Sequence, residues 1–246
     1  MKYRLNYQIQ FMDCDEQGKL KLSALIKLMM HISNLQLSQI GLGTKDFLTK
    51  NLGWVVTQYQ FDFKRWPRGS EQVVLTTEAK GFNRFFCYRD FGVETSAGEE
   101  LITVHSQWVI LDLAQRKMVT PTADLLSPLV QEANVRGKRI KRLRPLAEYD
   151  KKGSYLVRYD DLDTNHHVDN ANYFVWMTDP LGRDFLNQYE PASLLIQFDQ
   201  EVQYGQMVDS LLTVSEQSSQ HEIMSAGQKN ALALIKWRKV DKETNF

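Results

Sequence analysis

Two stretches of the chain, FMDCDEQGKLKLSALI at residues 11–26 and YDDLDTNHHVDNANYF at residues 159–174, have the same layout. Aligned without a gap, they share three positions: Asp13 with Asp161, Asp15 with Asp163, and Leu20 with Val168. In each, a strand-like segment leads through a polar turn into a helix-like segment. A repeat of this kind predicts two copies of one small domain, each able to cover a face that the other leaves exposed.

The first copy alternates between strand and helix patterns. Residues 3–11 place apolar and polar side chains in turn, as a half-buried strand does. Residues 22–35 carry apolar side chains three and four positions apart, which indicates a helix that ends near Gly41 and Gly43. Four strand-like runs follow before Leu113. The first copy therefore reads as a strand, a long helix and four strands.

The second copy has the same order. Residues 155–159 alternate as a strand, and residues 170–185 have a helical pattern with an interruption expected before Pro180. Three or four further strands are predicted after it.

The segment between the copies has prolines, little apolar periodicity and a concentration of Lys and Arg, which is typical of a connection. We therefore expect a first domain at residues 1–125, a basic linker at residues 126–150 and a second domain at residues 151–246.

The composition excludes several classes of protein. Thirty Lys and Arg balance thirty Asp and Glu, which argues against a general nucleic-acid binder. No apolar run approaches the length that spans a bilayer, and the first residues lack the apolar core of a signal peptide. Two cysteines cannot form a disulfide framework. A cytoplasmic protein without a membrane span is expected.

The two copies differ most at the polar turn. The first copy has Asp15, Gln17 and Lys19 at alternate positions, and the second has Asp163, Asn165 and His167. Alternate residues of an extended segment project to one side, so the second set can line one pocket. Histidine moves protons near neutral pH, and the amides at the start of the next helix can stabilise an oxyanion. Acyl-transfer chemistry fits this pattern; a solvated turn, with Asp169 or Asn170 as helix cap, is the structural alternative.

Other candidates are less specific. Glu201 lies in LLIQFDQEVQYG at residues 194–205, a predicted strand that otherwise looks largely buried. A carboxylate is costly there unless it is paired or functional, although an edge strand facing water would also hold it. Met29 and Met30 are candidates for an acyl pocket together with Trp54, and core packing is the alternative for the methionines. His31 and His105 are expected to be packing residues. Neither metal-ligand spacing nor a nucleotide-binding motif occurs, so we expect no metal and no cofactor.

With these residues in place, the chain resembles the acyl-ACP thioesterase family, as a bacterial relative of the plant plastid enzymes. DLDTNHHVDNANY at residues 161–173 is similar to the family motif DxNxHVNNxxY, and residues 53–71 and 106–121 support the likeness. The resemblance implies an α+β fold of two tandem hot-dog domains, each a long helix wrapped by an antiparallel sheet. It also implies hydrolysis of fatty acyl-ACP to a free fatty acid and holo-ACP.

The resemblance carries the family's functional positions onto Asp163, Asn165, His167 and Glu201. Plant members often have a cysteine directly after that glutamate, whereas this chain has Val202, which favours attack by water. Asp169 stands where the motif has its first asparagine.

Acyl carrier protein is the implied partner, and its acidity would suit a basic docking surface. The candidates for that surface are Arg136, Lys138, Arg139, Lys141 and Arg142. A solvated linker is the structural alternative. An acyl-CoA thioesterase and a non-catalytic acyl-binding module remain as functional alternatives, and the tandem could act as a monomer or a homodimer.

Overall fold

The computed structural model describes residues 2–130, 133–136, 141–164 and 167–240. These residues form two compact units, which are described separately. Unit 1 contains the described residues within 1–11 and 27–140, and unit 2 contains those within 12–26 and 141–246. Both units combine an antiparallel sheet with few helices, so the fold is of the α+β class.

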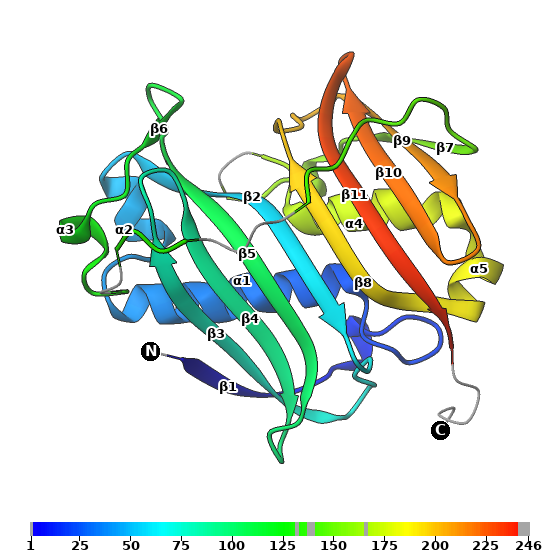
Figure 1. Cartoon of the computed structure of the whole chain (residues 1–246), viewed down its shortest axis with the longest axis horizontal. Helices are drawn as coiled ribbons and strands as arrows, with labels where there is room; N and C mark the ends of the chain where they lie inside the picture. The colour runs from blue at the N-terminus through cyan, green and yellow to red at the C-terminus, as the bar shows by residue number, and fades with distance from the viewer. Residues whose placement is uncertain (1, 131–132, 137–140, 165–166, 241–246) are drawn as a thin grey trace. The chain divides into compact units, whose positions relative to one another are not determined.

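Unit 1 has an antiparallel sheet in the strand order β1-β3-β4-β5-β2 (Figure 1). The strands are β1 (Tyr3–Gln8), β2 (Leu52–Phe63), β3 (Gln72–Phe82), β4 (Cys87–Thr95) and β5 (Glu100–Asp112), and the short β6 (Lys117–Val119) pairs with β5. Burial alternates along β1, with Tyr3, Leu5 and Tyr7 partly buried between exposed neighbours. The four strands predicted after the first helix are confirmed.

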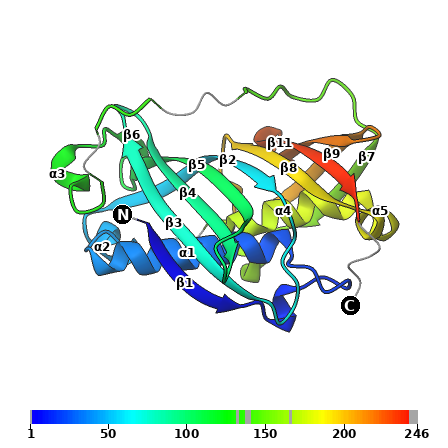
Figure 2. The ribbon, with the colours of Figure 1, turned by 60° about the horizontal axis from the view of Figure 1, so that its bottom comes forward.

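The long helix α1 (Leu22–Gln39) lies along one face of this sheet from Lys27 onward, and α2 (Thr44–Thr49) and α3 (Ala123–Leu126) are short (Figure 2). Its apolar stripe is buried, and the Tyr59 hydroxyl of β2 donates to the Met30 sulfur at 3.9 Å. The helix ends before Gly41, which takes the left-handed conformation with φ 69°. The predicted helix and its end are confirmed.

Unit 2 has an antiparallel sheet in the order β7-β9-β10-β11-β8. Its strands are β7 (Lys151–Leu156), β8 (Tyr189–Phe198), β9 (Met207–Val214), β10 (Ser218–Ser225) and β11 (Gln228–Lys239). The helix α4 (Asn170–Thr178) ends before Pro180, and a 3-10 turn separates it from α5 (Arg183–Gln188), so the predicted interruption is confirmed. Phe174 and Met177 of α4 are buried in this unit.

The strand order of unit 2 repeats that of unit 1 position by position, which confirms the internal repeat. The polar turns match as well. Each follows a 3-10 turn, Phe11–Asp13 or Tyr159–Asp161, and each is closed by an isolated bridge, Cys14 to Leu20 or Leu162 to Val168.

The polar turn of the first copy packs within unit 2. Glu16 pairs with Arg183, the Gln17 side chain donates to the Asn187 carbonyl at 2.9 Å, and Lys19 Nζ lies 3.7 Å from Glu190. These contacts explain why residues 12–26 belong to unit 2 although they precede β2 in the chain. In the part of the chain that the structure describes, no helix is long and apolar enough to cross a membrane.

Candidate functional site

The candidate site begins at the 3-10 turn Tyr159–Asp161, directly after β7. The Asp161 carboxylate accepts hydrogen bonds from the backbone N–H and the guanidinium of Arg158, both at 2.8 Å. Burial opposes ionisation of Asp161, but the hydrogen bonds from Arg158 outweigh burial and lower its pKa. The Asn172 side chain donates to the Asp161 carbonyl at 2.9 Å, which ties the turn to the start of α4.

Asp163 closes the next turn. Its backbone N–H donates to the His167 carbonyl at 2.7 Å, and its Oδ1 accepts from the His167 N–H at 3.3 Å. The first copy makes the same two bonds between Asp15 and Lys19, at 2.8 and 2.9 Å. Because the aspartate closes the turn whether histidine or lysine follows, Asp163 acts on the geometry of the turn.

The side chains of His167 and Glu201 are in contact. Nε2 of His167 lies 3.2 Å from Oε2 of Glu201, and the two side chains are 26% and 24% exposed. The sequence suggested that Glu201 lies in a strand, and this was wrong. Strand β8 ends at Phe198, and Glu201 lies in the loop that follows. An imidazole in contact with a carboxylate, reachable from solvent but partly shielded, can accept and return a proton. In the first copy the matching Lys19 faces Glu190 instead.

Tyr173 of α4 supports the same loop and was not predicted from the sequence. Its side chain is 3% exposed and hydrogen-bonds with the backbone of Val202, next to Glu201. Burial raises the pKa of the phenol, the Val202 backbone lowers it, and the Glu201 charge raises it further; the net shift is upward. The hydroxyl therefore stays protonated at neutral pH. Its signal in the sequence was its place as the final tyrosine of the motif at residues 161–173.

Asp169 caps α4, as predicted for this position or the next. Its side chain accepts from the Ala171 N–H at 2.9 Å, and its carbonyl accepts from the Asn172 N–H at 2.9 Å. Two amides of the first helical turn are thus bound within the chain. The start of α4 offers fewer donors to an oxyanion than the sequence analysis expected.

The remaining predicted residues lie in several places. Met29 and Met30 are in α1, and the Trp54 ring of β2 stacks on Phe47 with ring centroids 4.8 Å apart; all four residues belong to unit 1. Of the basic candidates, Arg136 is exposed in unit 1, and Lys141 and Arg142 are exposed in unit 2. Asn165, Lys138 and Arg139 lie outside the described residues. His31 is exposed, so the prediction that it packs in the core was wrong.

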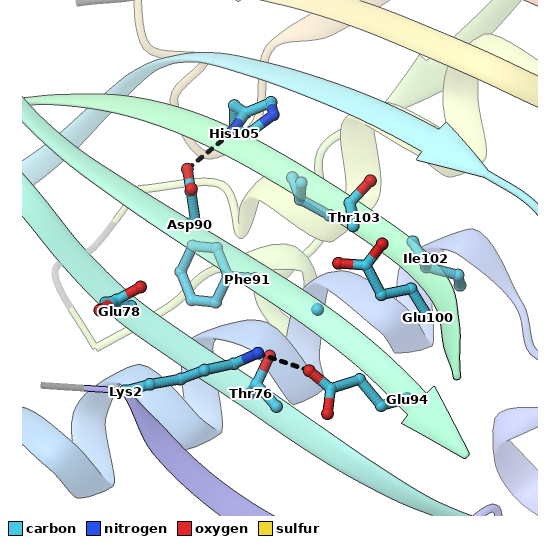
Figure 3. A pocket seen from close by; sticks show the side chains of 12 residues that line it. Lys2, Thr76, Glu78, Asp90, Phe91, Glu94, Glu100, Ile102, Thr103 and His105 are labelled. Atoms are coloured by element: carbon cyan, nitrogen blue, oxygen red, sulfur yellow. Dashed lines mark hydrogen bonds and ion pairs between the residues drawn. The ribbon is translucent and has the colours of Figure 1, made fainter. Parts of the chain in front are cut away.

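Unit 1 also has a hollow of about 340 Å³ beside β3, β4 and β5 (Figure 3). The carboxylates that line it are paired: Asp90 with His105 at 2.7 Å, Glu94 with Lys2 and Arg4, Glu78 with Lys80, and Glu100 with Lys64. The hollow is therefore lined by polar side chains, and each of its carboxylates contacts a basic side chain. His105, expected to pack in the strand, is instead 36% exposed at its side chain and bound to Asp90.

No group of three or more His, Cys, Asp or Glu among the described residues is placed to hold a metal ion.

Two family models match the chain. The acyl-ACP thioesterase N-terminal domain matches residues 1–129, and the acyl-ACP thioesterase C-terminal domain matches residues 145–239. Among curated proteins, the chain is 24% identical over 230 residues to the chloroplastic oleoyl-acyl carrier protein thioesterase of Coriandrum sativum, which covers 84% of this chain and 62% of the relative. It is 26% identical over 204 residues to the palmitoyl-acyl carrier protein thioesterase of Gossypium hirsutum, covering 78% of this chain and 48% of the relative. The chain thus spans only 62% and 48% of the length of these two curated relatives.

Two solved structures are similar to this protein over nearly its whole chain. A Lactobacillus plantarum protein, provisionally described as an oleoyl thioesterase, is 31% identical with a TM-score of 0.92, covering 98% of this chain and 96% of that one. The 12:0-ACP thioesterase of Umbellularia californica shares the fold, with a TM-score of 0.86 at 21% identity and coverage of 97% and 98%. On the matches to both family models and the 31% identity, this chain belongs to the acyl-ACP thioesterase family.

Proposed function

We propose that this protein hydrolyses the thioester of fatty acyl-ACP and releases a free fatty acid and holo-ACP. The observation that carries the proposal is the 3.2 Å contact between His167, within the family motif, and Glu201. Membership of the acyl-ACP thioesterase family supports the substrate. The first copy, with Lys19 in place of the histidine, lacks this pair, so one active site per chain is proposed.

In the proposed reaction, His167 and Glu201 orient a water molecule and remove one of its protons. The water oxygen attacks the carbonyl carbon of the thioester, and the C–S bond of the resulting tetrahedral intermediate breaks. The carrier's thiolate leaves and takes up the proton that the pair had accepted. Asp163 holds the turn, and Asn165 is proposed to position the water or the thioester carbonyl. Amides near the start of α4 are proposed to stabilise the oxyanion.

Water is the proposed nucleophile because neither cysteine suits that role. Burial, with Asp13 and Asp15 nearby, raises the pKa of the Cys14 thiol. Burial raises the pKa of Cys87 to about 12. A thiol that stays protonated at neutral pH is a weak nucleophile. Val202, beside Glu201, is fully buried and offers no nucleophilic atom.

The interior of unit 1 is the proposed acyl-binding region, with Met29, Met30 and Trp54 as its candidate contacts. Apolar and aromatic side chains suit a methylene chain. We further propose that residues 1–125 and 151–246 are two hot-dog repeats, and that residues 12–26 of the first pack within unit 2; the equal strand order of the two sheets supports this proposal. The proposed compartment is the cytoplasm, which suits two free, buried cysteines.

The proposal is tested by measuring thiol release from acyl-ACPs of several chain lengths, with acyl-CoAs of the same lengths in parallel. Faster release from acyl-ACP is the expected result. Faster release from acyl-CoA would show that the preferred substrate is carried by CoA rather than by ACP. Binding of acyl-ACP and acyl-CoA without thiol release would indicate an acyl-binding protein rather than a hydrolase.

The basic segment after residue 140 is proposed to dock the acidic carrier protein. Its backbone is held on unit 2, because the Gln197 side chain donates to the Lys141 carbonyl at 2.9 Å and accepts from the Leu143 N–H at 3.1 Å. Lys141 and Arg142 stay exposed. Changing both to glutamate is expected to raise KM for acyl-ACP about tenfold, because steering by opposite charge is lost.

The matched control reverses two exposed lysines of unit 1, Lys45→Glu with Lys50→Glu, which changes the net charge by the same amount. Only the first pair of substitutions is expected to raise KM for acyl-ACP, and neither pair should affect a short soluble thioester. An equal rise in both double variants would refute docking at Lys141 and Arg142.

A further inference from the structure

A β-bulge in β11 places Asn230 against the loop that carries Glu201. On β10, Ile223 pairs with Ala231 and Met224 pairs with Lys229, so Asn230 is the extra residue of the bulge. The side chain of Asn230 points inward, and the residue is only 1% exposed. Bulges bend a strand locally and re-aim a side chain, and they are frequent beside active sites.

Asn230 makes four hydrogen bonds to this loop. Its Nδ2 donates to the Glu201 carbonyl at 3.2 Å and to the Gln200 carbonyl at 3.4 Å. Its own carbonyl accepts from the N–H of Asp199 at 2.8 Å and from that of Gln200 at 3.3 Å. Both N–H and carbonyl groups of residues 199–201 are thus hydrogen-bonded to Asn230, up to and including the carbonyl of Glu201 itself.

From the α4 side, Tyr173 hydrogen-bonds with the backbone of Val202, the residue after Glu201. Glu201 therefore lies between two anchored backbone positions although it belongs to no strand. Loop residues are ordinarily more mobile than strand residues, and a carboxylate that must stay in contact with an imidazole needs such anchors.

Asn230 is a poor residue for stability alone. Asparagine is disfavoured in strands, and its Oδ1 is buried without a hydrogen-bond partner. An aliphatic residue would fill a buried strand position without leaving an acceptor unsatisfied. The contacts that offset this cost all go to the loop of Glu201.

We propose that Asn230 is a positioning residue that sets the place of the Glu201 carboxylate relative to His167. This inference rests on the proposed function of the His167–Glu201 pair. The hydrogen bonds of Asn230 go to the backbone of residues 199–201, and we propose that it acts through that backbone. A displacement of about 1 Å at a reacting group can cost about a hundredfold in rate.

The test is a double-mutant cycle with Glu201. Asn230→Ala, and Asn230→Asp of nearly equal size, are expected to lower kcat for acyl-ACP hydrolysis about 10- to 100-fold with KM changed less than about twofold. In a Glu201→Gln background, Asn230→Ala is expected to change kcat less than about threefold, because its target is already absent. Ser210→Ala, at another fully buried polar residue of the same sheet, is the matched control and should leave kcat unchanged.

Amide hydrogen exchange gives a readout that does not depend on activity. Asn230→Ala is expected to speed exchange of the Val202 N–H while leaving the amides in the centre of β10 protected. Unchanged kcat in both Asn230 variants, or an equal loss with and without the Glu201 carboxylate, would overturn the inference. If wild-type protein fails to hydrolyse any acyl-ACP, the proposed function falls, and unchanged exchange at Val202 would then overturn the positioning role as well.

Discussion

His167→Ala is expected to lower kcat for acyl-ACP hydrolysis about 1,000-fold, with a much smaller change in KM. The substitution removes the imidazole from the pair that takes the proton of the attacking water. Its side chain is 26% exposed, and the turn is closed by backbone bonds to Asp163, so the fold should tolerate the change. Steady-state thiol release at saturating acyl-ACP measures the loss, and thermal unfolding of both proteins verifies that the variant is folded.

The matched control is His31→Ala, which removes an exposed histidine of α1 and should leave kcat unchanged. Equal activity of His167→Ala and wild type would place the chemistry outside the polar turn of the second copy. Loss of activity in both histidine variants would instead indicate a general effect on the protein.

Acidification from pH 8 to pH 5 is expected to remove about 2 kcal/mol more unfolding free energy from wild type than from His221→Gln. Burial lowers the pKa of His221 from 6.5 to about 3, and the Met177 backbone offsets this only in part. The unfolded chain therefore binds a proton near pH 6.5 that the folded chain refuses until about pH 3. The stability that depends on neutral His221 is complete above pH 6.5 and declines as the pH falls toward 3.

The low pKa of His221 follows from its position in the interior of unit 2. Nε2 of His221 lies 2.6 Å from the Ser219 hydroxyl, which also accepts a hydrogen bond from Trp237 Nε1 at 2.8 Å. The serine hydroxyl and the indole thus give His221 neutral polar contacts within an otherwise apolar interior. Protonation of the ring would place a charge in that interior without a carboxylate to pair with it among these contacts.

Urea unfolding at pH 8 and pH 5 measures the unfolding free energy of each protein at each pH. Comparing how this free energy changes with pH cancels any pH-independent effect of the substitution on stability. His31→Gln, at an exposed histidine, should keep the slope of wild type. Identical slopes in His221→Gln and wild type would show that His221 is not held neutral by the fold.

Local patterns accounted for most secondary structure. The period of two in β1, the three- and four-residue spacing in α1 and the break before Pro180 all depend on neighbours within a few residues. Residue spacing misplaced Glu201, because no local signal marks where β8 stops pairing with β11. It also put His31 in the core, since a histidine beside an apolar stripe can face either way.

Sequence alone therefore determined the repeat and the polar turn that carries His167, because Asp163 closes that turn with bonds spanning only four residues. The tertiary structure decided which side chain His167 contacts. Glu201 reaches it from a loop placed by strand pairing, and the bulge at Asn230 holds that loop. Strand register and bulges depend on residues far apart in the chain, and a single sequence contains no periodicity that reports them.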